Sequence, residues 1–338
     1  MIKRIVFLLL PLVLLLARPA FCVNESGNVL HLTLGDPIES EMGQLGQAFK
    51  AFVEERSHGT VTVEITYGGR GPGEDEAFQF HRVQTGKLDM AFGGVANLEP
   101  MVNPLGVLTL PYLFSNLEEV VRGTTGEAAR LLNSYAENAG LRILAWTYCG
   151  FRNISNSKRS ITNLNDLHGL RIRVPQSLVM LETYRALGAI PSPIDWNMTW
   201  NALKNNEVDG QCYDYNGFRA MKFHEAGQKY ITEMHYLYLL QPLVISQQVF
   251  ERMHPAMQAI LLEAGRHVQE LSLHYQEEMS TKVKEELQKE GVQISTLTDE
   301  AAWRKLAREK VWPRVARHMG GTEVINAYLK AAGLPLWQ

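Results

Sequence analysis

The sequence has few cysteines, no excess of positive charge and only one long apolar run. Its 338 residues include three cysteines, and 33 Lys and Arg stand against 36 Asp and Glu, for a formal net charge of −3. This balance gives no electrostatic support for a nucleic-acid partner. No cysteine lies in a CxxC pair or at ligand spacing from a histidine. We therefore expect no nucleic-acid partner and no metal or other cofactor, in a chain long enough for about two domains.

The sequence also lacks the common catalytic motifs. It contains no HExxH, no G-x-S-x-G and no Walker lysine. The glycine-rich segment 68–73 reads G-G-R-G-P-G rather than GxGxxG, so we interpret it as a surface turn and not as a phosphate-binding loop. His224 and His235 have no spaced partner and are interpreted as surface or structural residues. The sequence therefore predicts that the chain is not an enzyme.

The one long apolar run, residues 5–16, follows Lys3 and Arg4. It is shorter than the roughly 20 apolar residues of a membrane span. A basic start, an apolar run and a cleavage site such as Ala20-Phe21-Cys22 are typical of a secretory signal peptide. We predict a signal peptide over residues 1–22 and a periplasmic location. Cys22 raises the question of a lipoprotein anchor, but the bulky Phe21 before it argues against one.

Two cysteines, Cys149 and Cys212, remain after this cleavage. An oxidising compartment permits a disulfide between them. Disulfide formation needs a specific separation and orientation of the two residues, which a sequence does not supply. The sequence therefore leaves the pairing of Cys149 with Cys212 open.

Predicted strands and helices alternate along the rest of the chain. Strands at 29–34, 61–67 and 88–94 are separated by helical patterns, and this order implies a parallel sheet with helices on its faces. A second α/β pattern follows Cys149. Residues 255–290 then show a helical pattern with no internal breaker, which is long for a globular helix. These patterns predict an α/β fold with two lobes.

The segment 170–177 contains the strongest candidate for a binding site. Leu170, Ile172 and Val174 alternate with Arg171 and Arg173, which predicts a short strand, and Ser177 is a candidate N-cap for the next helix. Both arginines can point to one face of this strand. That face either belongs to a solvent-exposed edge strand or lines a cleft where an arginine holds a carboxylate.

Aromatic and cationic residues recur where predicted strands end. Ligands of open α/β sheets bind at the carboxyl ends of the strands, so this recurrence indicates a cleft between two lobes. The residues concerned are Arg152, Arg173, Trp196, Tyr213, Tyr215 and Tyr112.

Several motifs resemble the substrate-binding proteins of TRAP transporters, the tripartite ATP-independent periplasmic transporters of the dicarboxylate-binding type. The resemblance covers nearly all of the predicted mature chain in the expected order. The motifs are G-F-R at 150–152, N-L-N-D-L-H-G-L-R-I-R-V-P at 163–175, V-D-G-Q at 208–211 and M-K-F-H-E at 221–225, together with G-K-L-D-M at 86–90, L-P-Y-L-F at 110–114 and P-L-V-I-S at 242–246.

This resemblance implies a two-lobed periplasmic-binding-protein fold, with strands crossing between the lobes and a long helix bracing both. We expect lobe I to hold residues 23–149 plus 240–278, and lobe II to hold residues 150–239 plus 279–338. The implied function is an extracytoplasmic receptor that binds an organic carboxylate and delivers it to a TRAP permease. A sensory protein that signals to a membrane receptor is the alternative. A secreted enzyme is the least favoured class. The long helix favours a monomer over a dimer, because bracing one molecule is its simpler use.

The resemblance also implies roles for single residues. Arg173 matches the arginine that holds the ligand carboxylate, and Arg152 matches a second polar contact, which leaves Arg171 as the solvated residue. Where relatives commonly have Glu-Asn-Pro, this chain has Cys212-Tyr213-Asp214, so Tyr213 or Asp214 must substitute for the asparagine. Trp196 stands where relatives often have phenylalanine. Phe78 aligns with a glutamate common in relatives. Asn97 and Tyr148 complete the predicted ligand-binding set.

The departures from the pattern leave two hypotheses for the ligand. Polar positions have become aromatic or apolar, which favours a carboxylate with an apolar or aromatic body, while Asp214 leaves room for a ligand amine. Alternatively, the aromatic residues refill volume around a small hydroxy or keto acid.

Overall fold

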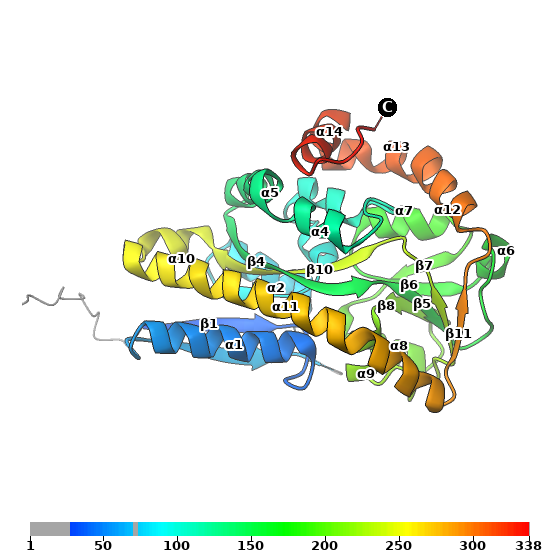
Figure 1. The fold of residues 1–338 in the computed structure, drawn as a ribbon, viewed down its shortest axis with the longest axis horizontal. Coiled ribbons are helices and arrows are strands. Elements are labelled where there is room, and N and C mark those ends of the chain that lie inside the picture. Colours follow the sequence, from blue (N-terminus) through cyan, green and yellow to red (C-terminus); the bar gives the residue numbers. More distant parts are fainter. Residues whose placement is uncertain (1–27, 70–73, 338) are drawn as a thin grey trace, which may run out of the picture.

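The protein consists of two α/β lobes built around two separate sheets. The computed structural model describes residues 28–69 and 74–337, so the predicted signal peptide, Cys22 and most of the glycine-rich turn lie outside the described residues. The two sheets confirm the predicted α/β class and the two-lobed arrangement (Figure 1).

The first lobe contains a five-stranded sheet in the order β2-β1-β3-β10-β4. Strand β1 pairs in parallel with β2 and β3, as the alternation of strands and helices predicts, and β10 runs antiparallel to β3 and β4. Strands β10 and β4 are buried almost continuously, as in a sheet covered on both faces, whereas β1 and β2 alternate buried and exposed side chains. Its strands are β1 (Asn28–Leu34), β2 (Val61–Tyr67), β3 (Met90–Phe92), β4 (Leu141–Phe151) and β10 (Tyr238–Ser246).

The second lobe contains a six-stranded sheet in the order β11-β9-β5-β8-β6-β7. Strands β6 and β7 pair in parallel, and β5 runs antiparallel to β8 and β9. Its strands are β5 (Asn153–Asn156), β6 (Arg171–Val174), β7 (Ile190–Pro193), β8 (Gly210–Tyr213), β9 (Tyr230–Glu233) and β11 (Gln293–Thr296).

Helices cover these sheets and begin at recognisable caps. Ser177 accepts a hydrogen bond from the backbone N–H of Met180, which confirms it as the N-cap of α7. The helices are α1 (Glu41–Arg56), α2 (Glu76–Gln84), α3 (Val95–Leu98), α4 (Leu117–Gly123), α5 (Gly126–Asn138), α6 (Leu164–Leu167), α7 (Leu178–Ala186), α8 (Trp196–Lys204), α9 (Tyr215–Ala220), α10 (Gln247–Arg252), α11 (Pro255–Lys289), α12 (Glu300–Leu306), α13 (Trp312–Val315) and α14 (Thr322–Ala331), with the 3₁₀ and π segments η1 (Asn103–Thr109), η2 (Ala307–Val311) and η3 (Ala316–Met319).

Two neighbouring strand connections and helix α11 pass between the lobes, and the chain crosses once more between residues 307 and 311. Strand β4 of the first sheet continues almost directly into β5 of the second, and β9 of the second sheet leads into β10 of the first. The backbone N–H of Arg152 donates to the carbonyl of Leu237 at 2.9 Å, so the two crossings lie side by side. Gly150, with φ of +116°, provides at the first crossing a backbone conformation that other residues rarely adopt. These crossings form the hinge.

Helix α11 braces both lobes, as the resemblance implied. Its first half buries Leu261, Ala264 and Val268 in the core of the first lobe, whereas Val283 and Leu287 pack into a core of the second. Figure 1 shows this helix running along the molecule past both sheets.

The C-terminal helices depart from the expected division of the chain. Trp303 and Ala307 pack in the second lobe, but Trp312 and Tyr328 belong to the main core of the first lobe. The indole N–H of Trp312 donates to the carbonyl of Pro111 at 3.0 Å, and Figure 1 shows α14 beside α5. The chain therefore returns to the first lobe between residues 307 and 311. Residues 279–338 do not all belong to the second lobe, because the apolar face of α14 is buried against α4, α5 and η1 of the first lobe.

Candidate functional site

A small pocket lies between the lobes, beside the hinge. The first lobe contributes Glu76 and Asn97 to its wall, and the second lobe contributes Arg173, Trp196 and Tyr213. Arg152, at the crossing from β4 to β5, also lines it. The pocket has room for about one water molecule. An organic acid of several heavy atoms therefore enters only when the lobes move apart.

Arg173 is the least satisfied cation of this pocket. Strand β6 directs it inward, and the side chain is buried. Its Nε donates to the carbonyl of Ile194 at 2.8 Å, whereas Nη2 is buried and has no hydrogen-bond partner among the described residues. Burial and the neighbouring Arg152 lower the pKa of Arg173 to about 10. A buried guanidinium with a free donor is suited to a carboxylate, which would satisfy both its charge and its N–H groups.

Arg152 is buried beside Arg173 but is held by the protein itself. Its Nη1 donates to the carbonyl of Cys212 at 2.8 Å, and its guanidinium carbon lies 5.3 Å from the centroid of the Tyr213 ring. Arg152 therefore adds positive charge to the pocket from a position that the hinge fixes.

Trp196 and Tyr213 form an aromatic wall. Their rings stack with centroids 4.6 Å apart, and the guanidinium of Arg173 lies 5.4 Å from the Trp196 ring centroid. A Cβ at Gly217 would come within 1.7 Å of the Tyr213 ring, so glycine at this position permits the stack. The indole N–H of Trp196 donates to Asp36 Oδ1 at 2.8 Å, across from one lobe to the other.

Glu76 is a pocket residue that the sequence analysis missed. Its Oε2 accepts hydrogen bonds from Asn97 Nδ2 at 2.5 Å and from the backbone N–H of Gly94 at 3.1 Å. Phe78, which the resemblance aligned with a glutamate, is 52% exposed and does not line the pocket. The helical spacing of the buried residues Glu76, Phe80 and Val83 was the available signal, because it turns Phe78 toward the solvent.

Asp214 and Tyr148 do not line this pocket either. Asp214 is buried and caps α9 by accepting from the backbone N–H of Gly217 at 3.1 Å. Tyr148 lies in the core of the first lobe, where its hydroxyl bonds to Thr124 and Gln269.

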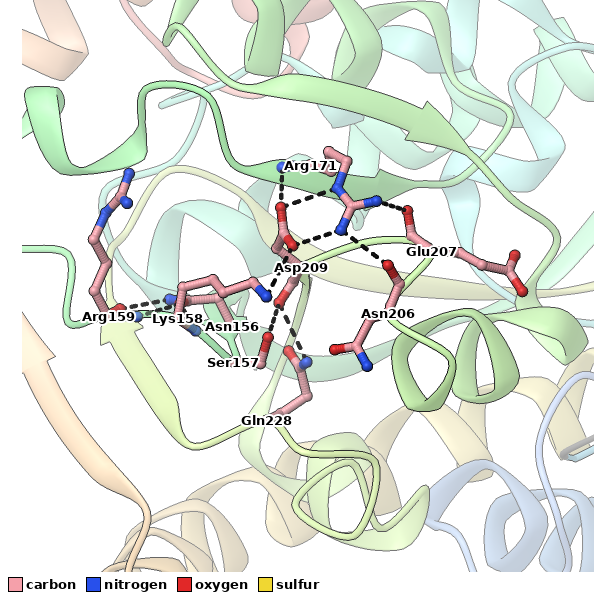
Figure 2. A network of polar contacts seen from close by, with 9 residues as sticks. All are labelled: Asn156, Ser157, Lys158, Arg159, Arg171, Asn206, Glu207, Asp209 and Gln228. Atoms are coloured by element: carbon pink, nitrogen blue, oxygen red, sulfur yellow. Dashed lines mark hydrogen bonds and ion pairs between the residues drawn. The ribbon is translucent and has the colours of Figure 1, made fainter.

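Arg171 is partly exposed, as expected of the solvated residue, but it has a structural role and does not lie on an edge strand. Strand β7 lies outside β6, so β6 is not an edge strand. Figure 2 shows Arg171 at the centre of a polar network with Asp209. Arg171 Nη2 lies 2.8 Å from Asp209 Oδ1, and the backbone N–H of Arg171 donates to Oδ2 at 2.9 Å. Burial raises the pKa of Asp209, but the hydrogen bonds from Arg171 outweigh it and leave this pKa below its ordinary value.

We expect Asp209→Asn to destabilise the second lobe. The carboxylate is buried and accepts from both the backbone and the side chain of Arg171, so the amide would leave at least one donor poorly satisfied. The expected loss is about 1–3 kcal/mol in the free energy of unfolding, measured by urea denaturation. Glu207→Gln is the matched control, because Arg171 binds the backbone carbonyl of Glu207 and not its carboxylate. Equal stabilities of the two variants would contradict the role of Asp209.

The two cysteines are not paired in the structure. Both are buried as free thiols. The Cys149 thiol donates to Gln241 Oε1 at 3.1 Å, and Cys212 Sγ accepts from the Tyr236 hydroxyl at 3.0 Å. Each sulfur is thus engaged by a different partner.

Comparisons with known proteins agree with this geometry. The model of the family "bacterial extracellular solute-binding protein, family 7" matches residues 36–318. The chain belongs to this family. It is 26% identical over 289 residues to the C4-dicarboxylate-binding protein DctB of Bacillus subtilis, covering 85% of this chain and 82% of the relative. It is also 26% identical over 259 residues to the 2,3-diketo-L-gulonate-binding periplasmic protein YiaO of Escherichia coli, covering 75% of this chain and 77% of that protein.

Solved structures of the same family share the fold. A TRAP periplasmic solute-binding protein from Ralstonia eutropha H16, with bound (S)-2-hydroxy-2-methyl-3-oxobutanoate, has a TM-score of 0.82 and 28% identity, covering 90% of this chain and 98% of that chain. A TRAP periplasmic solute-binding protein from Polaromonas, bound to D-erythronate, has a TM-score of 0.83 and 24% identity, covering 89% of this chain and 98% of that chain. The predicted resemblance to TRAP substrate-binding proteins is confirmed. The protein is a solute receptor of TRAP transport and not an enzyme.

Proposed function

We propose that this receptor binds a small organic acid with a single carboxylate, held by Arg173 between the two lobes. The observation that carries the proposal is the buried Nη2 of Arg173, which has no described partner. Arg152 adds a second positive charge nearby. Glu76 faces the same pocket, so a second carboxylate on the ligand would meet an acidic neighbour, whereas a hydroxyl could donate a hydrogen bond to it.

The aromatic wall supports a small hydroxy or keto acid rather than a ligand with an aromatic body. Trp196 already contacts Tyr213, Arg173 and Phe223 through its ring, and its N–H is bound to Asp36. Contacts within the protein thus cover most of the surface of the Trp196 ring. The small acid bound to the Ralstonia eutropha protein is consistent with this ligand class.

Export and delivery complete the proposed function. Residues 1–22 would direct the chain to the periplasm, where the loaded receptor would pass its ligand to a TRAP permease. Among the described residues, no helix has the length and apolar character of a membrane span.

A thermal-shift panel with matched neutral analogues tests the ligand class. Each hydroxy or keto acid, including (S)-2-hydroxy-2-methyl-3-oxobutanoate and D-erythronate, is compared with its own amide. We expect at least one acid to raise the melting temperature of the receptor, because a ligand that binds only the folded state stabilises it. Its amide should have no effect. Identifying the small molecule released on denaturation by mass spectrometry is the second readout. A released ligand without a carboxylate, or an amide as effective as its acid, would contradict the role of Arg173.

A further inference from the structure

Trp196 and Asp36 lie on opposite lobes, at the side of the pocket away from the hinge. Asp36 follows β1, and β3 separates β1 from the crossing pair β10 and β4. Trp196 begins α8 directly after β7, the outer strand of the second sheet, with β8 and β6 between β7 and the crossing strand β5. A contact at this distance from the hinge resists opening with a long lever arm.

The contact between them is a buried and directional hydrogen bond. The indole Nε1 of Trp196 donates to Asp36 Oδ1 at 2.8 Å, and both side chains are buried. The oxygen of Asp36 can accept from the indole N–H in either protonation state of the carboxyl group, so the bond persists wherever the lobes are closed. Parting the lobes would break this bond and expose both groups.

Trp196 also stands at the mouth of the pocket. It lines the pocket together with Arg173, and it borders a larger surface groove together with Gly35 and Asn197. A ligand at Arg173 would therefore be screened from the surface by the Trp196 ring while the bond to Asp36 persists.

We propose that the Trp196–Asp36 hydrogen bond is an inter-lobe latch that holds the receptor closed and slows release of its ligand. The latch deepens the proposed function, since its kinetic effect rests on an acid being bound at Arg173. Trp196 is thus a positioning residue whose N–H, and not only its ring, determines how long the ligand stays. Phenylalanine at this position would keep the stack on Tyr213 but could not form the latch.

A set of variants separates the latch from the aromatic wall. Trp196→Phe removes the donor, Asp36→Ala removes the acceptor, and the double variant removes both. Trp200→Phe is the matched control on the same helix, because the Trp200 N–H donates to the carbonyl of Lys222 within the second lobe. Spin labels on cysteines introduced at Glu39 and Met198, exposed positions beside Asp36 and Trp196, report the distance between the lobes. Of the native cysteines, Cys149 and Cys212 are buried and should not react with the label, and the labelled protein is prepared without residues 1–22.

Without ligand, the parent protein should show a closed population with a short label distance. Trp196→Phe and Asp36→Ala should each deplete this population, the double variant should deplete it no further than either single variant, and Trp200→Phe should not change it. With (S)-2-hydroxy-2-methyl-3-oxobutanoate as the probe, each latch variant should release ligand about tenfold faster or more, with little change in the association rate.

The outcomes distinguish the latch from the proposed function. Unchanged label distances and unchanged release rates in both single variants would overturn the latch while leaving the receptor function intact. Additive effects in the double variant would also overturn it, because they would show that the two residues act separately. If no acid of the panel binds the parent but the label distances respond as expected, the latch holds and the proposed ligand class is wrong.

Discussion

Arg173→Met should abolish the acid-induced rise in melting temperature and leave the ligand-free protein folded. Methionine keeps most of the aliphatic volume of the side chain but removes the charge and the free Nη2 donor. Losing one partner of a buried, hydrogen-bonded charge pair costs on the order of 2–5 kcal/mol of binding. Isothermal titration with the acid identified in the panel measures this loss. Binding as tight as that of the parent would mean that Arg173 does not hold the ligand.

The same substitution should not weaken the ligand-free protein. Arg173 is buried beside Arg152, forms no ion pair with a described carboxylate, and has its pKa lowered to about 10 by burial and by that neighbour. Glu76 and Asp75 attract this charge without forming an ion pair with it, and replacing such a weakly paired buried charge with an apolar side chain is often neutral or stabilising. We therefore expect an unchanged or higher melting temperature without ligand.

Two further variants sharpen the test. Arg173→Lys keeps a positive charge but loses the planar fork, so its affinity should fall between those of the parent and Arg173→Met. Arg171→Met, two residues away on the same strand, should leave acid affinity unchanged, because Arg171 binds Asp209 outside the pocket.

The sequence predicted the two-lobed α/β fold because its local signals agreed with one another. Alternation along 61–67, the cap at Ser177 and the unbroken pattern over 255–290 each matched the element that formed. The return of the chain to the first lobe near residue 310 could not be predicted in this way. An amphipathic helix shows that it has an apolar face but not which core buries that face.

The pocket was predictable only in part for the same reason. Arg173 and Arg152 were predicted from motifs, Trp196 and Tyr213 from departures from the family pattern, and Asn97 without a motif. The structure brings these five residues together. Phe78 was assigned from an alignment two residues away from Glu76, and helix geometry turns the two side chains to different sides. The Asp36–Trp196 bond joins residues 160 positions apart, and no local pattern signals such a contact.

Ligand affinity should fall as pH rises, because closing the lobes buries the carboxylates of Asp36, Glu41, Glu76 and Asp214. These four groups are called the seam carboxylates, since they lie where the two lobes meet. Asp36 and Glu41 of the first lobe accept hydrogen bonds from Trp196 and Asn216 of the second. Burial, together with repulsion from Glu76 and Asp214, raises the pKa of Asp36 to about 7. Burial and repulsion from Asp214 raise the pKa of Glu41 to about 8.

The direction of this pH dependence follows from the difference in pKa between the closed and open forms. Burial raises the pKa of Asp214 to about 6, although the charge of Arg152 opposes this rise. Burial also raises the pKa of Glu76 above its ordinary value, and the charge of Arg173 is among the effects that oppose it. Opening returns seam carboxylates toward their ordinary pKa values, so closure takes up protons. The closed form is therefore fully favoured only below those ordinary values, and this contribution is lost as pH rises through about 6 to 8.

Titration calorimetry between pH of about 5 and about 8 should show a decrease in affinity of at least about tenfold. A pKa that differs by one unit between the open and closed forms changes the equilibrium between them by about tenfold. Binding in two buffers with different ionisation enthalpies should show net proton uptake. Asp36→Asn is the decisive control, because its amide oxygen still accepts from Trp196 but no longer titrates. That variant should bind with a flatter pH dependence than the parent. A parent affinity that is constant across this range, or that rises with pH, would mean that the seam carboxylates stay charged in the closed form.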